Sequence, residues 1–382
     1  MEPLGFGAIF AQAFVELWLV WLVLAALMGT SFVLRKRLGL YGQLYDSWVG
    51  MVGLALVFFW VITALLADYV LPFDPQQQFA SMKRAVPGAF TPEGQVMLFG
   101  GDNLGRDVFS RLLKGSQTVL AIAPAATLFA FMVGITLGLP AGFYGKIIDT
   151  VLTFLANLVL AFPVILLFYL LVTPGIRDTP IPTTMAAILF FFPIAFFFLF
   201  FYSRYKTRPD VLWMQLLAVA VVGGWMYMGL AFNSDPLGIL AMDPNTLNIF
   251  VSVVFVNSPT VFRIVRGLTM DIKTRDYVAA AQTRGERPWY IMLWEILPNA
   301  RGPLIVDLCL RIGYTTILLG TLGFFGLGVS PESPDWGLSI SEGRKIWRSV
   351  EHVALPPALA LMSLVLGLNL LADSLREQSL KD

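Results

Sequence analysis

The chain has 382 residues, of which 57% are hydrophobic and 13% charged, and its mean hydropathy is +0.74. Because soluble domains carry about a quarter charged residues, this composition indicates a polytopic membrane protein rather than a large soluble core. A net charge of +1 gives no reason to expect a nucleic-acid partner, the single Cys309 excludes an intramolecular disulfide, and one histidine (His352) argues against a metal site or a bound cofactor.

Nine apolar runs are long enough to cross a bilayer, which takes about 20 helical residues. In chain order we predict spans at residues 13–34, 49–71, 117–140, 150–173, 184–203, 211–232, 247–265, 303–328 and 353–373. The first run is expected to be retained rather than cleaved as a signal peptide, because it is long and precedes Arg35-Lys36-Arg37. The fold class predicted from these runs is therefore an all-α polytopic membrane protein.

Basic residues predict the orientation, because cytoplasmic loops carry the excess of Lys and Arg. Nine spans place the two termini on opposite sides of the membrane. With the C-terminus inside, the inner segments hold sixteen Lys and Arg residues and the outer segments nine. The short loops at 35–37 and 203–208 show the asymmetry most clearly. We therefore expect the N-terminus outside and the C-terminus in the cytoplasm.

The segment 276–303 is charged and helix-forming, although it lies between two apolar runs. Residues 278–282 favour a helix, and Gly285 can adopt the left-handed conformation that ends one. Pro288 suits the first turn of a second helix, which 297–299 (Leu-Pro-Asn) is expected to break. The segment predicts a rigid helix–turn–helix exposed to the cytoplasm or, as the alternative, an amphipathic helix lying on the bilayer surface. The second helix would have an apolar face made of Trp289, Ile291, Met292, Leu293 and Ile296.

Several further segments match one family in that family's order. They are GDNLGRDVFSR at 101–111 before a span, Ala161-Phe162-Pro163 within a span, Arg266-Gly267 and Arg275-Asp276-Tyr277-Val278 before the charged segment, LGFFGLG at 322–328 with Pro331, Pro334 and Trp336-Gly337, and LGLNLLADSLR at 366–376. Together they resemble the dipeptide/oligopeptide-type permeases of ABC importers. The resemblance covers residues 49–173 and 244–378, about two thirds of the chain.

The resemblance implies a type I ABC-importer permease core of six transmembrane helices, with about three extra helices in this chain. It implies a non-catalytic subunit in a bacterial or archaeal plasma membrane. The implied partners are two ATP-binding cassette ATPase subunits, a second and non-identical permease chain, an extracytoplasmic solute-binding protein and the lipid bilayer. The residues expected to couple this chain to the ATPase are Tyr277, Ala280, Ala281, Gly285, Leu297 and Pro298.

The implied organisation has five parts. They are an extra N-terminal span with a basic loop (1–48), the first core span with an outer loop (49–116), further core spans (117–173), an inserted two-span hairpin (174–243), and core spans with a cytoplasmic coupling loop at 267–302 (244–382).

Three features depart from the family pattern. Ala279 occupies the position of the acidic residue that names the family's loop, so no glutamate contact to an ATPase is available there. The span at 13–34 precedes the usual start of the family. The segment 174–243 adds two spans joined by SRYKTRPD, and its run FFFPIAFFFLFFY predicts a lipid-facing or partner-facing surface.

Polar and small residues within the spans have two readings each. Gly134, Gly138 and Gly142 follow the small-xxx-small spacing that lets helices approach closely, so packing is favoured over substrate contact. Five further residues are candidates for the pathway or for helix packing: Asn157, Pro163, Asp307, Arg311 and Asn369. Asp307 and Arg311 are four residues apart, so they can pair where an unpaired charge is costly.

Other functions are weighed against what the sequence lacks. No G-x-x-x-x-G-K-[ST] phosphate loop occurs, so the chain is not itself the ATPase. The main alternative is a secondary transporter driven by an ion gradient, which usually shows an ionisable relay and an internal repeat. Peptides are the favoured substrate, with nickel chelates, glutathione and oligosaccharides as alternatives.

Overall fold

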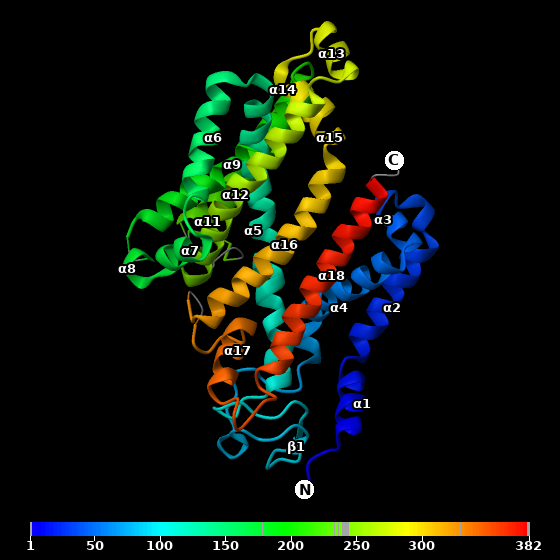
Figure 1. Cartoon of the computed structure of the whole chain (residues 1–382), viewed down its shortest axis with the longest axis vertical. Helices are drawn as coiled ribbons and strands as arrows, with labels where there is room; N and C mark the ends of the chain where they lie inside the picture. Colours follow the sequence, from blue (N-terminus) through cyan, green and yellow to red (C-terminus); the bar gives the residue numbers. More distant parts are fainter. Residues whose placement is uncertain are drawn as a thin grey trace. The chain divides into compact units, whose positions relative to one another are not determined.

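The computed structural model describes residues 2–177, 179–232, 234–235, 237–238, 244–327 and 330–379, and its helices are shown in Figure 1. The chain forms two compact units. The first comprises residues 1–124 and 309–382, and the second comprises residues 125–308. Two long helices, α5 (Val108–Tyr144) and α16 (Arg301–Phe324), contribute one part to each unit.

The first unit contains the helices nearest the two ends of the chain. The start of the chain lies beside a short hairpin, where the Leu4 amide donates to the Gly88 carbonyl at 3.0 Å. The end of the last helix lies beside α3, where the Gln378 side chain donates to the Gln43 carbonyl at 3.2 Å. Its elements are α1 (Phe6–Glu16), α2 (Trp18–Val33), η1 (Arg35–Arg37), α3 (Leu40–Gln43), η2 (Leu44–Asp46), α4 (Trp48–Val70), η3 (Ala80–Met82), β1 (Ala89–Phe90), β2 (Val96–Met97), the start of α5 (Val108–Tyr144), the end of α16 (Arg301–Phe324), α17 (Trp336–Lys345) and α18 (Leu355–Ser379).

Glycines allow α4 and α18 to cross at close range. A Cβ atom built on Gly53 would lie 2.9 Å from the Leu371 amide nitrogen, and one on Gly367 would lie 2.8 Å from the Leu56 Cβ. Neither distance is tolerated by a larger residue without movement of a helix. Close packing of this kind is a main source of helix association in a bilayer, where apolar surfaces gain little from leaving lipid.

The second unit contains the central helices of the chain. Its elements are the end of α5, α6 (Lys146–Leu160), α7 (Val164–Val172), α8 (Pro174–Arg177), α9 (Ile181–Tyr205), α10 (Pro209–Ala218), η4 (Val219–Gly223), α11 (Gly224–Phe232), α12 (Pro244–Ile272), α13 (Asp276–Thr283), α14 (Pro288–Tyr290), η5 (Ile291–Ile296), α15 (Leu297–Asn299) and the start of α16. Figure 1 shows α13 at the end of this unit, past α12.

Candidate membrane spans agree with the predicted all-α class. Among the described residues, seven single helices are long and apolar enough to cross a membrane, and two bent pairs of helices bring the number to nine. The small β1–β2 sheet lies in a loop between two spans and leaves the class unchanged. Helix α5 is longer than predicted, because it begins at Val108 rather than at 117.

Two predicted spans are not straight. The run 150–173 was expected to be one helix, but α6 and α7 meet at an angle of 79° around Ala161-Phe162-Pro163. Pro163 has no amide hydrogen, and its ψ of 121° is extended, so α7 starts anew after it. In the first span, α1 and α2 meet at 61° across Leu17.

The glycine row on α5 packs against α12, as its spacing predicts. Cβ atoms built on Gly134, Gly138 and Gly142 would lie within 3 Å of Val261, Val265 and Thr269 side chains respectively. Successive glycines thus meet successive turns of α12. The row is confirmed as a packing surface between two helices of the second unit.

Candidate functional site

The charged segment between α12 and α16 folds as a helix, a turn and a second helix. Helix α13 ends in a Schellman motif. The Glu286 amide donates to the Ala281 carbonyl at 3.2 Å, and the Gly285 amide donates to the Gln282 carbonyl at 2.9 Å. Gly285 has a φ of 78°, as predicted, which disfavours any residue with a Cβ atom.

The second helix begins at Pro288 and continues as a π-helical turn over residues 291–296. Residues 297–299 were predicted to break it but are helical, and the break falls at Ala300 (ψ of −3°). Pro298 lies in the short helix α15, which follows the π-helical turn without a break, and it lacks the amide hydrogen that an interior helical residue donates.

Both helices are fixed to the membrane helices by a shared core. Val278 and Ala281 of α13 are buried against the second helix. The same core extends to α12 and α5, so the α13–α15 unit (residues 276–299) is not a loosely tethered loop. Its buried members include Leu139, Val261, Val265, Ile272, Ile291, Met292, Leu293 and Ile296.

The six residues predicted for coupling differ in their exposure. Tyr277, Ala280, Gly285 and Pro298 lie on the surface. Leu297 is half-buried. Ala281 is 0% exposed, so it fixes α13 to the second helix and has no surface to offer a partner. Arg284 and Glu295 form a 3.0 Å ion pair that links the two helices on the exposed side.

Three of the five candidate pathway or packing residues have contacts or a backbone role that the structure shows. Asn157 of α6 accepts a 2.6 Å hydrogen bond from Arg263 Nη2 of α12, so it links two helices. Pro163 forms the α6–α7 bend. Asn369 of α18 faces Gly313, whose built Cβ would lie 3.7 Å from its Oδ1. Asp307 lies on α16, one turn before Arg311, and the pairing of these two stays a prediction.

A contact between α9 and the α13–α15 unit was missed from the sequence. Trp294 lies against α9, with its Nε1 donating to Ser203 Oγ at 3.0 Å. The Trp294 ring centroid is 4.6 Å from that of Phe200. The Arg204 guanidinium lies over the Trp294 ring, 4.6 Å from its centroid. The aromatic run of α9 was predicted to face lipid or a partner, and for Phe200 this is wrong. Only the unusual density of aromatic residues could have drawn attention to it.

A buried acid–base cluster lies in the first unit. Arg106 is 1% exposed and bridges Asp102 at 2.6 Å and Glu342 of α17 at 2.8 Å. Arg111 lies 4.0 Å from Asp102 and donates to the Ser333 carbonyl at 2.8 Å. These contacts fasten the loop before α5 to the segment around α17.

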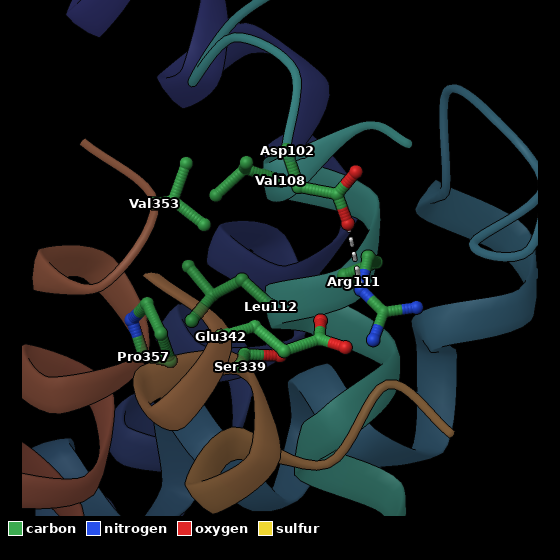
Figure 2. A pocket seen from close by; sticks show the side chains of 8 residues that line it. All are labelled: Asp102, Val108, Arg111, Leu112, Ser339, Glu342, Val353 and Pro357. Atoms are coloured by element: carbon green, nitrogen blue, oxygen red, sulfur yellow. Dashed lines mark ion pairs between the residues drawn. The ribbon is translucent and has the colours of Figure 1, made fainter. Parts of the chain in front are cut away.

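A cavity of about 10 Å³ borders this cluster, and its lining side chains are drawn in Figure 2. It is lined by Asp102, Val108, Arg111, Leu112, Ser339, Glu342, Val353 and Pro357. Its volume suits about one water molecule, which is too small for a transported solute. The cluster is therefore structural.

Two further carboxyls of the first unit, those of Asp107 and Asp335, are buried. Burial raises the pKa of Asp107 and of Asp335 to about 6 each. Each carboxyl also accepts an amide hydrogen at a helix start, Asp107 from Ser110 at 2.7 Å and Asp335 from Leu338 at 2.9 Å. The helix-capping bonds oppose the effect of burial on the pKa without cancelling it.

Comparisons with known proteins find similar membrane permeases. The family described as binding-protein-dependent transport system inner membrane component matches residues 207–379. The dipeptide transport system permease protein DppC of Haemophilus influenzae is 26% identical over 86% of this chain and 88% of its own length. The glutathione transport system permease protein GsiD of Pectobacterium atrosepticum is 29% identical, over 83% and 81% respectively. The di/tripeptide permease DppC of Pseudomonas aeruginosa is 28% identical over 85% of each chain.

This chain carries the match to that family over residues 207–379 and aligns with these permeases over more than four fifths of its length. It is thus a multi-pass inner membrane permease of an ABC importer, and it is a non-catalytic subunit. Permeases of this class work with ATPases and with solute-binding proteins.

Proposed function

We propose that the chain forms one side of a peptide translocation pathway and that its α13–α15 unit receives the movement of a separate ATPase subunit. One observation carries the proposal. The unit is a folded helix pair whose core is continuous with that of α12, and α16 begins directly after it. A force on its exposed face would therefore be passed to two spans rather than absorbed by a flexible loop.

The exposed face has the chemistry of a docking surface for a protein. Tyr277 offers an aromatic ring that is 39% exposed, and Ala280 beside it permits close approach of another backbone. Tyrosine is enriched at protein interfaces because it combines a large apolar surface with a polar tip. Tyr277, Ala280, Gly285 and Pro298 form the contact surface in this proposal. Leu297 and Ala281 hold the surface in shape.

The proposed assembly has the C-terminus of this chain in the cytoplasm and the N-terminus outside. Two ATPase subunits would each seat one coupling loop, and a second, non-identical permease would complete the pathway. A solute-binding protein would deliver the substrate from outside. The basic loops at 35–37 and 203–208 support this orientation.

Small peptides are the proposed substrate. Relatives named for dipeptides, for di- and tripeptides and for glutathione align over more than four fifths of the chain. Glutathione is itself a tripeptide, so the three names share a substrate class of short, charged, peptide-like molecules.

Affinity purification of the tagged chain from its native membrane, with mass spectrometry of the proteins that accompany it, tests this assignment. The proposal predicts an ATPase with a phosphate loop and a second permease. ATP hydrolysis by that assembly, with its binding protein, should rise with dipeptides or tripeptides or with glutathione. Recovery of this chain alone, in mild detergent and at good yield, would contradict the proposal and favour an ion-driven transporter.

A further inference from the structure

We propose that the α9–α11 hairpin (residues 181–232) is a brace that sets the position of the α13–α15 unit, with Trp294 as the positioning residue. The inference rests on the proposed coupling function and assigns a role to helices that the family resemblance leaves unexplained. The end of α9 and the π-helical turn η5 form one packed junction within the second unit.

Trp294 is held on three sides by α9. Phe200 packs against its ring with the centroids 4.6 Å apart, Arg204 lies over the ring at 4.6 Å, and Ser203 accepts its Nε1 hydrogen at 3.0 Å. The aromatic contact and the cation–π contact restrain the ring, and the hydrogen bond restrains the direction of its Nε1.

The junction extends beyond this one side chain. Phe196 and Leu199 of α9 pack against the core that joins α13, η5 and α12. Arg204 Nη1 also approaches the Tyr290 hydroxyl at 3.5 Å. The side of α9 that carries residues 196, 199, 200 and 203 therefore belongs to the core of the α13–α15 unit.

The π-helical turn explains how one short segment serves two partners. A π-helical turn is wider than an α-helical turn and spreads its side chains over more directions. Ile291, Met292 and Ile296 are buried in the core shared with α13 and α12, whereas Trp294 contacts α9. A displacement of η5 must either carry the end of α9 with it or separate these contacts.

The brace therefore has a functional consequence. If α9 holds Trp294, a push on α13 moves the helix pair and its spans as one body, and ATP hydrolysis is converted to transport. If α9 releases Trp294, the second helix can shift relative to the hairpin and passes less of the movement to the spans, so less substrate is moved for each ATP hydrolysed. The quantity that reports this difference is the number of substrate molecules moved per ATP hydrolysed.

The test uses the complete transporter in proteoliposomes, with uptake of the peptide that stimulates its ATPase and phosphate release measured on the same samples. Ser203→Ala removes the hydrogen bond to Trp294, and Arg204→Gln removes the cation above its ring. Trp294→Ala removes all three contacts with α9. We expect substrate moved per ATP to fall about twofold in each of the first two and at least fivefold in Trp294→Ala. Trp294→Phe keeps the ring contact and should recover part of the loss.

Trp213→Ala is the matched control, because Trp213 is on the same hairpin and 70% exposed. It should leave the ratio unchanged, and all variants should retain the ATPase subunits on purification. Equal ratios for the wild type, Ser203→Ala, Arg204→Gln and Trp294→Ala would overturn the brace while leaving the coupling function intact. Failure of the wild-type chain to purify with an ATPase would instead overturn the coupling function.

Discussion

Asp149 on α6 and Arg266 on α12 form a two-pronged ion pair within the second unit. Arg266 Nη2 lies 2.6 Å from Asp149 Oδ2, and Arg266 Nε donates to the other carboxylate oxygen. Both side chains are partly screened from solvent, with 29% of Arg266 and 17% of Asp149 exposed. The pair joins α6 to α12. An unpaired charge within a membrane helix is costly, so removal of either residue leaves the other in an unfavourable setting.

Loss of either partner should therefore destabilise the protein. Asp149→Ala and Arg266→Ala are each expected to lower the free energy of unfolding by about 1–3 kcal/mol, between the values for exposed and for buried pairs. The double variant should lose less than the sum, because each single variant leaves a charge without its partner. Thermal unfolding in detergent measures all three. Additive losses would show that the two residues act independently.

Gly138 tests the close approach of α5 and α12. A Cβ atom there would lie 2.8 Å from the Val265 Cβ and 3.0 Å from the Phe262 carbonyl oxygen, so Gly138→Ala must push the helices apart. We expect a loss of about 1–3 kcal/mol in the free energy of unfolding. Gly267→Ala is the control on α12, since nothing lies within 4 Å of its Cβ position. A control as damaging as Gly138→Ala would contradict the packing argument.

Gly285 tests the turn between the two helices of the α13–α15 unit. Its φ of 78° costs a β-branched residue about 1–2 kcal/mol or more, although no atom lies within 4 Å of the Cβ position. Gly285→Val should reduce peptide uptake per ATP hydrolysed in proteoliposomes. Gly285→Asn should retain most of the uptake, because asparagine tolerates this conformation at a helix end. Normal uptake by Gly285→Val would show that the turn geometry is not required.

Stability should depend on pH through Asp107 and Asp335. Burial raises the pKa of each to about 6, above the ordinary value of 3.8, so the folded state binds protons that the unfolded state has released. Their contribution to the free energy of unfolding is fully present below about pH 4 and is lost as the pH rises through about 6. The wild-type melting temperature should therefore fall between pH 5 and pH 7 relative to that of Asp107→Asn/Asp335→Asn.

The comparison with this double variant is needed because His352 acts in the opposite direction. Burial lowers the pKa of His352, so its protonation in the unfolded state reduces stability as the pH falls below about 6.5. The variant keeps His352 and differs only at the two carboxyls. Parallel melting curves for the two proteins across this range would show that neither carboxyl titrates as burial predicts.

Most of the span pattern could be predicted from the sequence, because a run of about 20 apolar residues has the length and composition of a helix that crosses a bilayer. The bends could not be placed in the same way. A proline such as Pro163 can break a helix, but a proline inside a span need not do so, because α9 and α12 continue through Pro193 and Pro259. Leu17 carries no signal at all. Whether a helix bends at such a residue depends on what packs beside it.

The structure of the α13–α15 unit was predictable from the sequence where it depends on the conformational limits of single residues. Gly285 and Pro288 define a turn and a helix start through their own conformational limits. The exposure of neighbouring alanines was not predictable, because Ala280 and Ala281 differ only in the face of α13 that meets the second helix. The junction of Trp294 with Phe200 joins residues 94 positions apart, and no local pattern indicates such a pairing.

Ala280 and Ala281 provide the most direct test of the central claim that α13 docks on an ATPase subunit. After Cys309→Ala removes the natural thiol, Ala280→Cys places a thiol on the exposed face and Ala281→Cys places one in the core. A thiol-to-amine cross-linker of short reach is then applied to the purified transporter. The account predicts a cross-link to the ATPase from Ala280→Cys and none from Ala281→Cys. A cross-link from neither variant, in a complex that hydrolyses ATP and transports peptide, would contradict it.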